Sequence, residues 1–277
     1  VRPGERIARV NDRATDLLAE IDYTVLAAHC KSEESRKDAF LILERLDNSS
    51  FGPDPALALA RMYLAFAERH RLRVTVLDER QSEGSLRQVV LFIEGLCPYG
   101  VLRHEHGIHR LISEEETSRR HRERVTAFCH VELLAEISDA ELRLARNDVL
   151  VSNEGMSASS LLEVRQKHAV RVAHRPTNTL VCVRADASQE SVLELAHGLL
   201  RARLGARTGE RSDAATTSTP VRSYRFGAVP SVKDEATGER SAKLGDVLEG
   251  RIEPFLAARA AWERSREELA RLGNGRA

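Results

Sequence analysis

The sequence predicts an α+β fold with two cores. Strand-like stretches followed by a helix occur twice along the chain, without the regular strand–helix alternation of a parallel sheet. The 277 residues are enough for two domains that each bury a core. Hydrophobic residues make up 42% of the chain and charged residues 30%, a composition typical of globular proteins. We therefore expect two mixed units, with helices at both ends of the chain.

The chain begins with helical periodicity and continues with a strand. Residues 5–38 predict one or two polar helices, because apolar side chains recur there at helical spacing. Residues 39–46, "AFLILERL", are strand-like. The apolar stripe of the helical region consists of Ile7, Val10, Leu17, Leu18, Ile21, Val25 and Leu26.

Turn residues then separate a second helix from two further strands. Residues 47–55 predict a loop, in which Asp54 suits the N-cap and Pro55 the first turn of a helix. Two strands follow this helix, at "RVTVL" and "QVVLFIEG", with "DERQSEGS" turning between them. The apolar face of the helix consists of Leu59, Tyr63 and Phe66.

The second half of the chain predicts a hairpin, two helices and a polar linker. Residues 169–176 and 178–185 alternate around a turn and form the hairpin. Residues 188–205 are an amphipathic helix, and the small polar residues of 207–220 predict a linker. A short strand, "VRSYRF", precedes the final helix over 252–272.

Composition excludes several classes of protein. The 42 basic and 42 acidic residues cancel, so any contact with phosphates must come from local patches. Four scattered cysteines without a CxxC pair indicate a reducing compartment and argue against a zinc ribbon or a disulfide framework. Neither an apolar run long enough to cross a membrane nor a signal-peptide core is present. We expect a cytoplasmic protein without membrane contact.

Three separated segments resemble the bacterial class I peptide chain release factors. "ARMYLAFAERHRLRVTVLDE" followed by "YGVLRHEHGIHRL" is similar to the second domain of that family, and "AVRVAHRPTNTLVCV" to the hairpin of its catalytic domain. "VRSYRFGAVPSVKDEATGERSAKLGDVLEGRIEPFLAA" looks like the C-terminal segment of release factor 2, the type that reads UGA. The segments keep the family's order and nearly its spacing, over residues 39 to 260 approximately.

The resemblance implies a class I release-factor core, in which a mixed codon-recognition superdomain accompanies a small α/β domain. The expected parts are a shortened N-terminal helical segment (1–38), a unit like domain 2 (39–140) completed by 221–260, a degenerate catalytic-type domain (141–206), a flexible linker (207–220) and a C-terminal helix extension (261–277).

A histidine group within "RHEHGIHRL" raises the question of a metal site. His104, His106 and His109 could together offer three imidazoles. However, no helix is predicted there, and no acidic residue or cysteine stands at a fixed spacing as a fourth ligand. The resemblance instead makes residues 107–111 a family motif. We expect neither a metal nor a cofactor.

The resemblance also implies a stop-codon reader between Leu111 and Phe128, with a Ser-Pro-Phe tripeptide followed by a stacking histidine. This chain has no Ser-Pro-Phe, and Val125 stands where the histidine is expected. Valine has no flat π face on which a base can stack. The acidic run Glu114–Glu116 predicts a solvated loop and is a poor neighbour for phosphates.

The catalytic loop that the resemblance implies, Gly-Gly-Gln, falls between Leu142 and Ala169. In the family, its glycines permit unusual dihedral angles, and the glutamine N–H faces the charge that develops on the ester carbonyl. Here the only glycine is Gly155, followed by Met156 and Ser157. We expect no catalysis, although a displaced loop around Gln166, which no glycine precedes, stays open as an alternative.

The positions of basic residues indicate where the chain could contact RNA. The basic helix start that grips ribosomal RNA in the family is "ASQESVLE" here, over 187–194, without lysines. A different cluster follows the acidic run and could contact RNA, although a surface helix in which Glu114, Glu115 and Glu123 pair with these arginines explains it equally well. The candidate RNA contacts are His109, Arg110, Arg119, Arg120, Arg122 and Arg124.

Together these features predict a homologue of release factor 2, a translation-termination factor, that binds the ribosome or structured RNA without codon-specific peptidyl-tRNA hydrolysis. DNA is not an expected partner. One alternative is a peptidyl- or aminoacyl-ester hydrolase with a displaced loop, although no GxSxG elbow supports a serine nucleophile. The other is a scaffold that reuses the fold to bind a protein partner.

Overall fold

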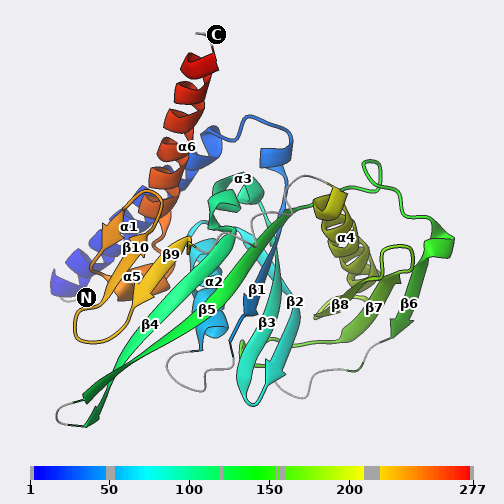
Figure 1. The fold of residues 1–277 in the computed structure, drawn as a ribbon, viewed down its shortest axis with the longest axis horizontal. Coiled ribbons are helices and arrows are strands. Elements are labelled where there is room, and N and C mark those ends of the chain that lie inside the picture. Colours follow the sequence, from blue (N-terminus) through cyan, green and yellow to red (C-terminus); the bar gives the residue numbers. More distant parts are fainter. Residues whose placement is uncertain are drawn as a thin grey trace.

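A large mixed sheet occupies the centre of the computed structural model, which describes residues 3–47, 54–118, 121–153, 155, 160–208 and 219–274. Within these residues the large sheet has eight strands and a second, smaller sheet has three (Figure 1). The strand orders are β11-β10-β9-β4-β5-β1-β3-β2 and β6-β7-β8. Neighbouring strands are antiparallel except β4 and β9, which are parallel.

The strands of the large sheet come from two distant parts of the chain. The C-terminal segment supplies β9 to β11, and β9 pairs with β4 so that His109 lies opposite Arg222. The bounds are β1 Ala39–Arg45, β2 Arg73–Ser82, β3 Ser85–Glu94, β4 Gly107–Ser118, β5 His121–Ala135, β9 Arg222–Arg225, β10 Ser231–Asp234 and β11 Arg240–Ser241.

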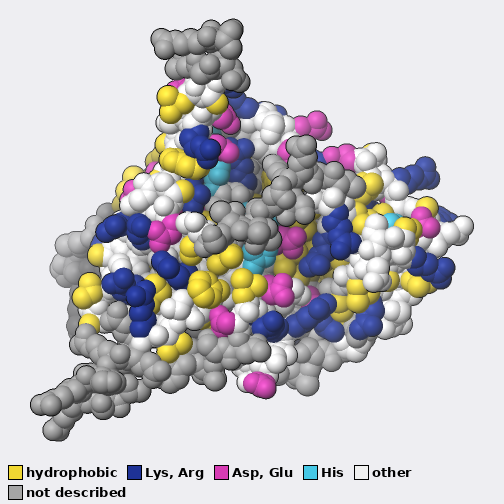
Figure 2. All heavy atoms as spheres, in the orientation of Figure 1, with side chains coloured by type: hydrophobic (Ala, Val, Ile, Leu, Met, Phe, Trp, Pro, Cys, Tyr) yellow, Lys and Arg dark blue, Asp and Glu magenta, His cyan; other side chains and the backbone are white. Residues whose placement is uncertain are grey.

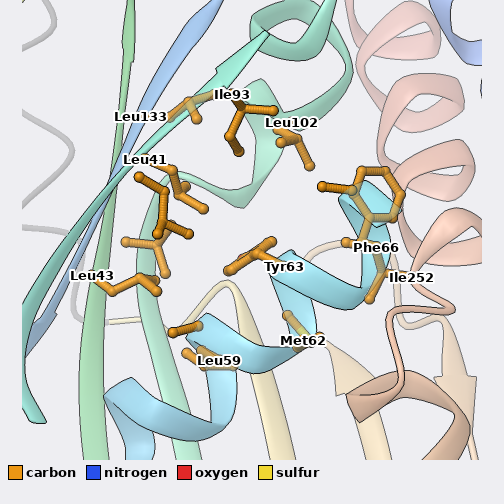
Figure 3. Close-up of a cluster of buried hydrophobic side chains, with 14 of the residues drawn as sticks. Leu41, Leu43, Leu59, Met62, Tyr63, Phe66, Ile93, Leu102, Leu133 and Ile252 are labelled. Carbon is orange, nitrogen blue, oxygen red and sulfur yellow. The ribbon is translucent and has the colours of Figure 1, made fainter. Parts of the chain in front are cut away.

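Helices cover one face of the large sheet. Helix α2 begins as its sequence predicts, because the Asp54 side chain accepts a hydrogen bond from the Leu57 amide at 3.1 Å and Pro55 follows the cap. Its apolar side packs on the sheet (Figure 3). The helices are α1 Pro3–Ala28, α2 Pro55–Arg69, α3 Pro98–Leu102, α5 Leu244–Leu248 and α6 Glu253–Asn274, with short 3₁₀ turns at Glu34–Arg36 and Arg103–Glu105.

The smaller sheet and α4 pack on the opposite face. Because side chains alternate along a strand, Leu41 and Leu43 of β1 face α2, whereas Phe40 and Ile42 face the small sheet. The second core is therefore built jointly by both sheets. Its other elements are β6 Val149–Asn153, β7 His168–His174, β8 Thr179–Ala185 and α4 Gln189–Thr208, with a 3₁₀ turn at Arg146–Asp148.

One region differs from the sequence prediction. The stretch after Leu111, expected to be a loop or a surface helix, forms the outer part of a long β4–β5 hairpin. The register places Glu114 opposite Arg124 and Glu116 opposite Arg122. The same register places Glu115 opposite Glu123, so the charges across the hairpin are mixed. The stretch extends the sheet by continuing the backbone pairing of the inner part of β4 and β5.

A buried ion pair lies between the helical layer and the large sheet. Arg222 and Glu105 are both fully buried, and the guanidinium donates two hydrogen bonds to the carboxylate, at 2.9 and 2.6 Å. The Tyr63 hydroxyl donates a third, at 2.8 Å. Burial raises the pKa of Glu105, but the positive charge of Arg222 more than offsets this, and the net pKa is lowered. The pair therefore stays ionised inside the protein.

This ion pair joins elements that are far apart in the sequence. Tyr63 belongs to α2, Glu105 to the turn before β4, and Arg222 to β9. The guanidinium also lies 4.5 Å from the centroid of the Phe255 ring, in α6. The C-terminal segment is thus attached to the turn before β4 by the Arg222–Glu105 ion pair, and to β4 itself by strand pairing.

We expect removal of Arg222 to destabilise the fold strongly. Arg222→Met leaves Glu105 buried without its partner charge, which typically costs about 3–5 kcal/mol of unfolding free energy. Urea unfolding measures this change. The control, Arg110→Met, removes a half-buried ion pair with Glu235 and should cost about 1 kcal/mol or less. Equal destabilisation in the two variants would contradict the importance given to the buried pair.

Candidate functional site

The three histidines of the conspicuous motif have separate partners. His104 Nε2 lies 3.3 Å from a carboxylate oxygen of Glu263, and His106 Nδ1 accepts a hydrogen bond from the Leu133 amide at 3.2 Å. His109 Nε2 donates to the Glu105 carbonyl oxygen at 2.9 Å. Over the described ranges, no three His, Cys, Asp or Glu side chains are grouped so that they could hold a metal ion.

His109 lies in the interior of the protein. Its side chain is fully buried, and Nδ1 is 3.2 Å from the Tyr224 hydroxyl. Burial lowers its pKa to about 4, so the ring is neutral at physiological pH. A buried neutral imidazole cannot contact RNA, and the expectation that His109 belongs to the RNA-binding residues is wrong. Its role is to support the buried Glu105–Arg222 pair.

Of the other predicted RNA contacts, three belong to strands β4 and β5. Arg110 is half-buried on β4, where it donates to the Ser223 hydroxyl and pairs with Glu235 at 3.2 Å. Arg124 is exposed on β5. The backbone of Arg122 belongs to β5, whereas Arg119 and Arg120 lie outside the described residues.

The structure brings together a basic row that the sequence does not indicate. Across the sheet, Arg110 of β4 lies beside Ser223 of β9, Ser223 beside Lys233 of β10, and Lys233 beside Arg240 of β11. Such cross-strand neighbours share one face. Two residues further along β9, the exposed Arg225 extends the row on that face. Figure 2 shows Lys and Arg side chains gathered over β9 and β10.

We call Arg110, Arg225, Lys233 and Arg240 the basic row. Glu235, which pairs with Arg110 and Lys233, is the acidic residue that contacts it. Four cations against one carboxylate leave a positive surface that suits phosphates. The row depends on the parallel pairing of β4 with β9, and no local sequence pattern indicates that pairing.

The segment in which the resemblance places the catalytic loop contacts Arg184 and β2. The Arg184 side chain donates to the Gly155 carbonyl oxygen at 3.1 Å and also pairs with Asp78 of β2. At the other end, the Ser160 hydroxyl and the following amide, that of Leu161, each donate to the Glu79 carboxylate at 2.6 Å. Met156 and Ser157 lie outside the described residues. One described end of the segment is therefore bonded to Arg184 of β8, which itself pairs with β2, and the other end is bonded directly to β2.

Asp78 and Glu79 make this attachment possible. They are consecutive residues of β2 and are only 2% and 3% exposed. A β-bulge between Val76 and Asp78 interrupts the regular alternation of the strand. Two buried carboxylates on an edge strand would be costly without partners, and the segment together with Arg184 supplies them. No sequence signal distinguishes these residues.

Gln166 and Val125, the other two positions that the resemblance singles out, lie next to or within strands. Gln166 is half-buried and lies two residues before β7, next to Lys167, whose amide donates to the Ala185 carbonyl oxygen at 3.0 Å. Val125 lies on β5 directly opposite Ser113. Neither residue is at the tip of a loop.

The start of α4 is an ordinary capped helix start. The Ser188 hydroxyl accepts a hydrogen bond from the Ser191 amide at 3.2 Å, and Val192 is fully buried. Val192 therefore serves the core shared by the two sheets. This explains in physical terms why no basic side chain stands at that position.

The sequence and the fold are both similar to those of known proteins. A model of the PCRF domain matches residues 53–131. Peptide chain release factor 2 of Campylobacter jejuni is 28% identical over 257 residues, covering 87% of this chain and 68% of that protein. The protein of the same name from Treponema pallidum is 29% identical over 258 residues, covering 87% and 69%. RF2 of Thermus thermophilus, a solved structure, matches with a TM-score of 0.73 at 26% identity, over 96% of this chain and 78% of that chain.

The chain is similar to release factor 2 over most of its length, at 26–29% identity. The resemblance carried by its three segments and the predicted α+β release-factor fold are both confirmed. None of the helices in the described parts of the chain combines the length and the apolar character that a membrane span requires.

We expect Glu79→Ala to release the segment around Ser160 without unfolding the large sheet. The variant removes the acceptor of the Ser160 hydroxyl and of the Leu161 amide. Hydrogen exchange at Leu161 should accelerate by about tenfold or more, since each of these hydrogen bonds contributes about 1 kcal/mol. The control, Glu94→Ala, removes a surface pair with Arg73. Unchanged exchange at Leu161 in Glu79→Ala would contradict the attachment.

Proposed function

We propose that this protein binds the ribosome or structured RNA as a release-factor relative that does not release the nascent peptide. The observation that carries the proposal is the attachment of the segment that replaces the catalytic loop. Gly155 is its only glycine, and both described ends of the segment are hydrogen bonded, to Arg184 and to Glu79. Transition-state stabilisation by a backbone N–H requires a loop that can present that N–H to the ester carbonyl.

The hairpin formed by β4 and β5 supports the absence of codon-specific reading. It occupies the stretch in which the resemblance places the reader loop, and its register sets Glu114 opposite Arg124 but Glu115 opposite Glu123. Val125 offers no ring for stacking on a base. Such an arm is suited to a protein or RNA surface of mixed charge rather than to a single-stranded codon.

The basic row supports binding to RNA. Arg225 and Arg240 are exposed, and Lys233 lies between them in the sheet. Cations on a rigid sheet can contact successive phosphates without the entropic cost of ordering a loop. The release-factor fold and this surface together favour the ribosome, on which proteins of this family name act.

The alternative of a displaced catalytic loop receives no support from the position of Gln166. Gln166 lies two residues before β7, and the amide of its neighbour Lys167 donates to the Ala185 carbonyl oxygen of β8. This hydrogen bond holds the backbone next to Gln166 against the small sheet, so presenting the glutamine to a substrate would require the contact to break.

We expect no peptide release from programmed ribosomes. Ribosomes that hold formyl-methionyl-tRNA, with UGA, UAA or UAG in the decoding site, are mixed with the protein and the released formyl-methionine is measured. Loss of one oxyanion donor costs about 10²–10³ in rate, and the absence of a base-stacking side chain weakens binding further. Release above the factor-free rate at any of the three codons would overturn the proposal, and Gln166→Ala would then test the displaced loop.

We expect the protein to co-sediment with ribosomes through the basic row. Arg225→Glu combined with Arg240→Glu should reduce co-sedimentation, and the slope of log affinity against log salt should fall by about 2, because each arginine neutralises one phosphate. Arg264→Glu, at an exposed position of α6, is the matched control. The pair Arg119→Glu and Arg120→Glu separately tests the predicted arginine contacts that lie outside the described residues. Unchanged binding in both double variants would exclude both groups of arginines.

A further inference from the structure

Helix α1 has apolar side chains on two opposite faces. One face is buried against the body of the protein and includes Ala19, Tyr23 and Leu26. The Tyr23 hydroxyl donates to the Leu96 carbonyl oxygen at 2.7 Å and anchors this face. The other face points away from the body. It consists of Leu17, Leu18, Ile21 and Val25, which are 58%, 61%, 51% and 52% exposed.

A helix that is apolar on both faces is normally covered on both. Four large apolar side chains, each more than half exposed and adjacent on one helix, form a contiguous patch rather than scattered surface residues. Helix α1 lies at the edge of the helical layer, and on the body side it contacts α2, α3 and α6 (Figure 1). The outer face is therefore available to a partner.

The spacing of the apolar positions indicates the kind of partner. Ile7, Val10, Ala14, Leu17 and Ile21 follow one another at intervals of three, four, three and four residues. This is the heptad pattern with which one helix packs lengthwise against another. The exposed Leu18 and Val25 widen the stripe on one side. The partner is accordingly a helix that carries the same pattern.

Charge selects the partner and its orientation. Arg13 and Glu20 are seven residues apart and lie on the same flank of the stripe. If two copies of α1 pair antiparallel, with Ala14 opposite Leu17, each Arg13 faces the Glu20 of the other copy. A parallel pair would place the apolar Leu18 opposite Arg13. Only the antiparallel pair matches opposite charges, and it does so twice by symmetry.

We propose that α1 mediates a symmetric dimer, in which its outer face packs antiparallel against α1 of a second copy. The body-side face of each helix keeps its intramolecular contacts. Glu20 also lies 2.6 Å from Arg71, whose side chain is 82% exposed. An ion pair with so exposed an arginine contributes little to stability, so Glu20 can exchange it for a contact with Arg13 of the second copy.

The full-length chain tests this proposal by sedimentation equilibrium over a wide range of protein concentrations. The wild type should show a concentration-dependent dimer. Leu17→Glu combined with Ile21→Glu should make it monomeric with an unchanged circular dichroism spectrum. Val229→Glu is the control, because Val229 is 74% exposed in a loop elsewhere and should leave the dimer intact. A wild type that stays monomeric, or a dimer that survives the double change, would overturn the proposal.

A charge exchange tests the orientation. Arg13→Glu or Glu20→Arg alone places like charges opposite each other at two symmetric contacts and should weaken dimerisation by about tenfold. The two substitutions together restore opposite charges and should return the dimer to wild-type strength. If the combined variant is as weak as the single ones, antiparallel pairing is wrong.

Discussion

The buried pair between Arg222 and Glu105 is the interaction on which the rest of the fold depends. Burying a guanidinium or a carboxylate without an oppositely charged partner costs several kcal/mol of free energy, so the two groups must lie together in the folded protein. Meeting this requirement brings β9 beside β4 and places α6 against the body. The neutral, buried His109 completes the site by bonding to the Glu105 backbone. The strand that carries part of the basic row is thus positioned by an interaction in the interior.

A second pair of buried acids organises the other half of the molecule. Asp78 and Glu79 bind Arg184, Ser160 and the backbone of the neighbouring segment. The segment between Gly155 and Leu161 is thereby attached to Arg184 and to the edge strand β2. The apolar core shared by the two sheets also holds the small sheet against the large one, since Phe40 and Ile42 pack with Val172 and Leu199. Charge and packing both favour one fixed arrangement.

The local elements can be predicted from the sequence, and the long-range ones cannot. The N-cap at Asp54 and the buried face of α2 follow from propensity and periodicity, which act over a few residues. The charged stretch after Leu111 has no local hairpin signal, because its strands depend on cross-strand pairs. The positions of Arg225 and Glu79 depend on contacts with distant segments, which a single sequence does not display. His109 resembles a surface residue in the sequence because burial has no local signature in a histidine-rich stretch.

The parallel pairing of β4 with β9 also governs how the chain folds while it is being made. Glu105 and Arg222 are 117 residues apart, so at about 5–20 residues per second the carboxylate waits on the order of ten seconds for its guanidinium. During this time β4 is an open sheet edge with unpaired backbone groups. The nascent chain is then at its most vulnerable to aggregation and to capture by chaperones. Folding of the large sheet is completed only when β9 has been synthesised, and a truncation that removes β9 leaves a chain that cannot pair its buried Glu105.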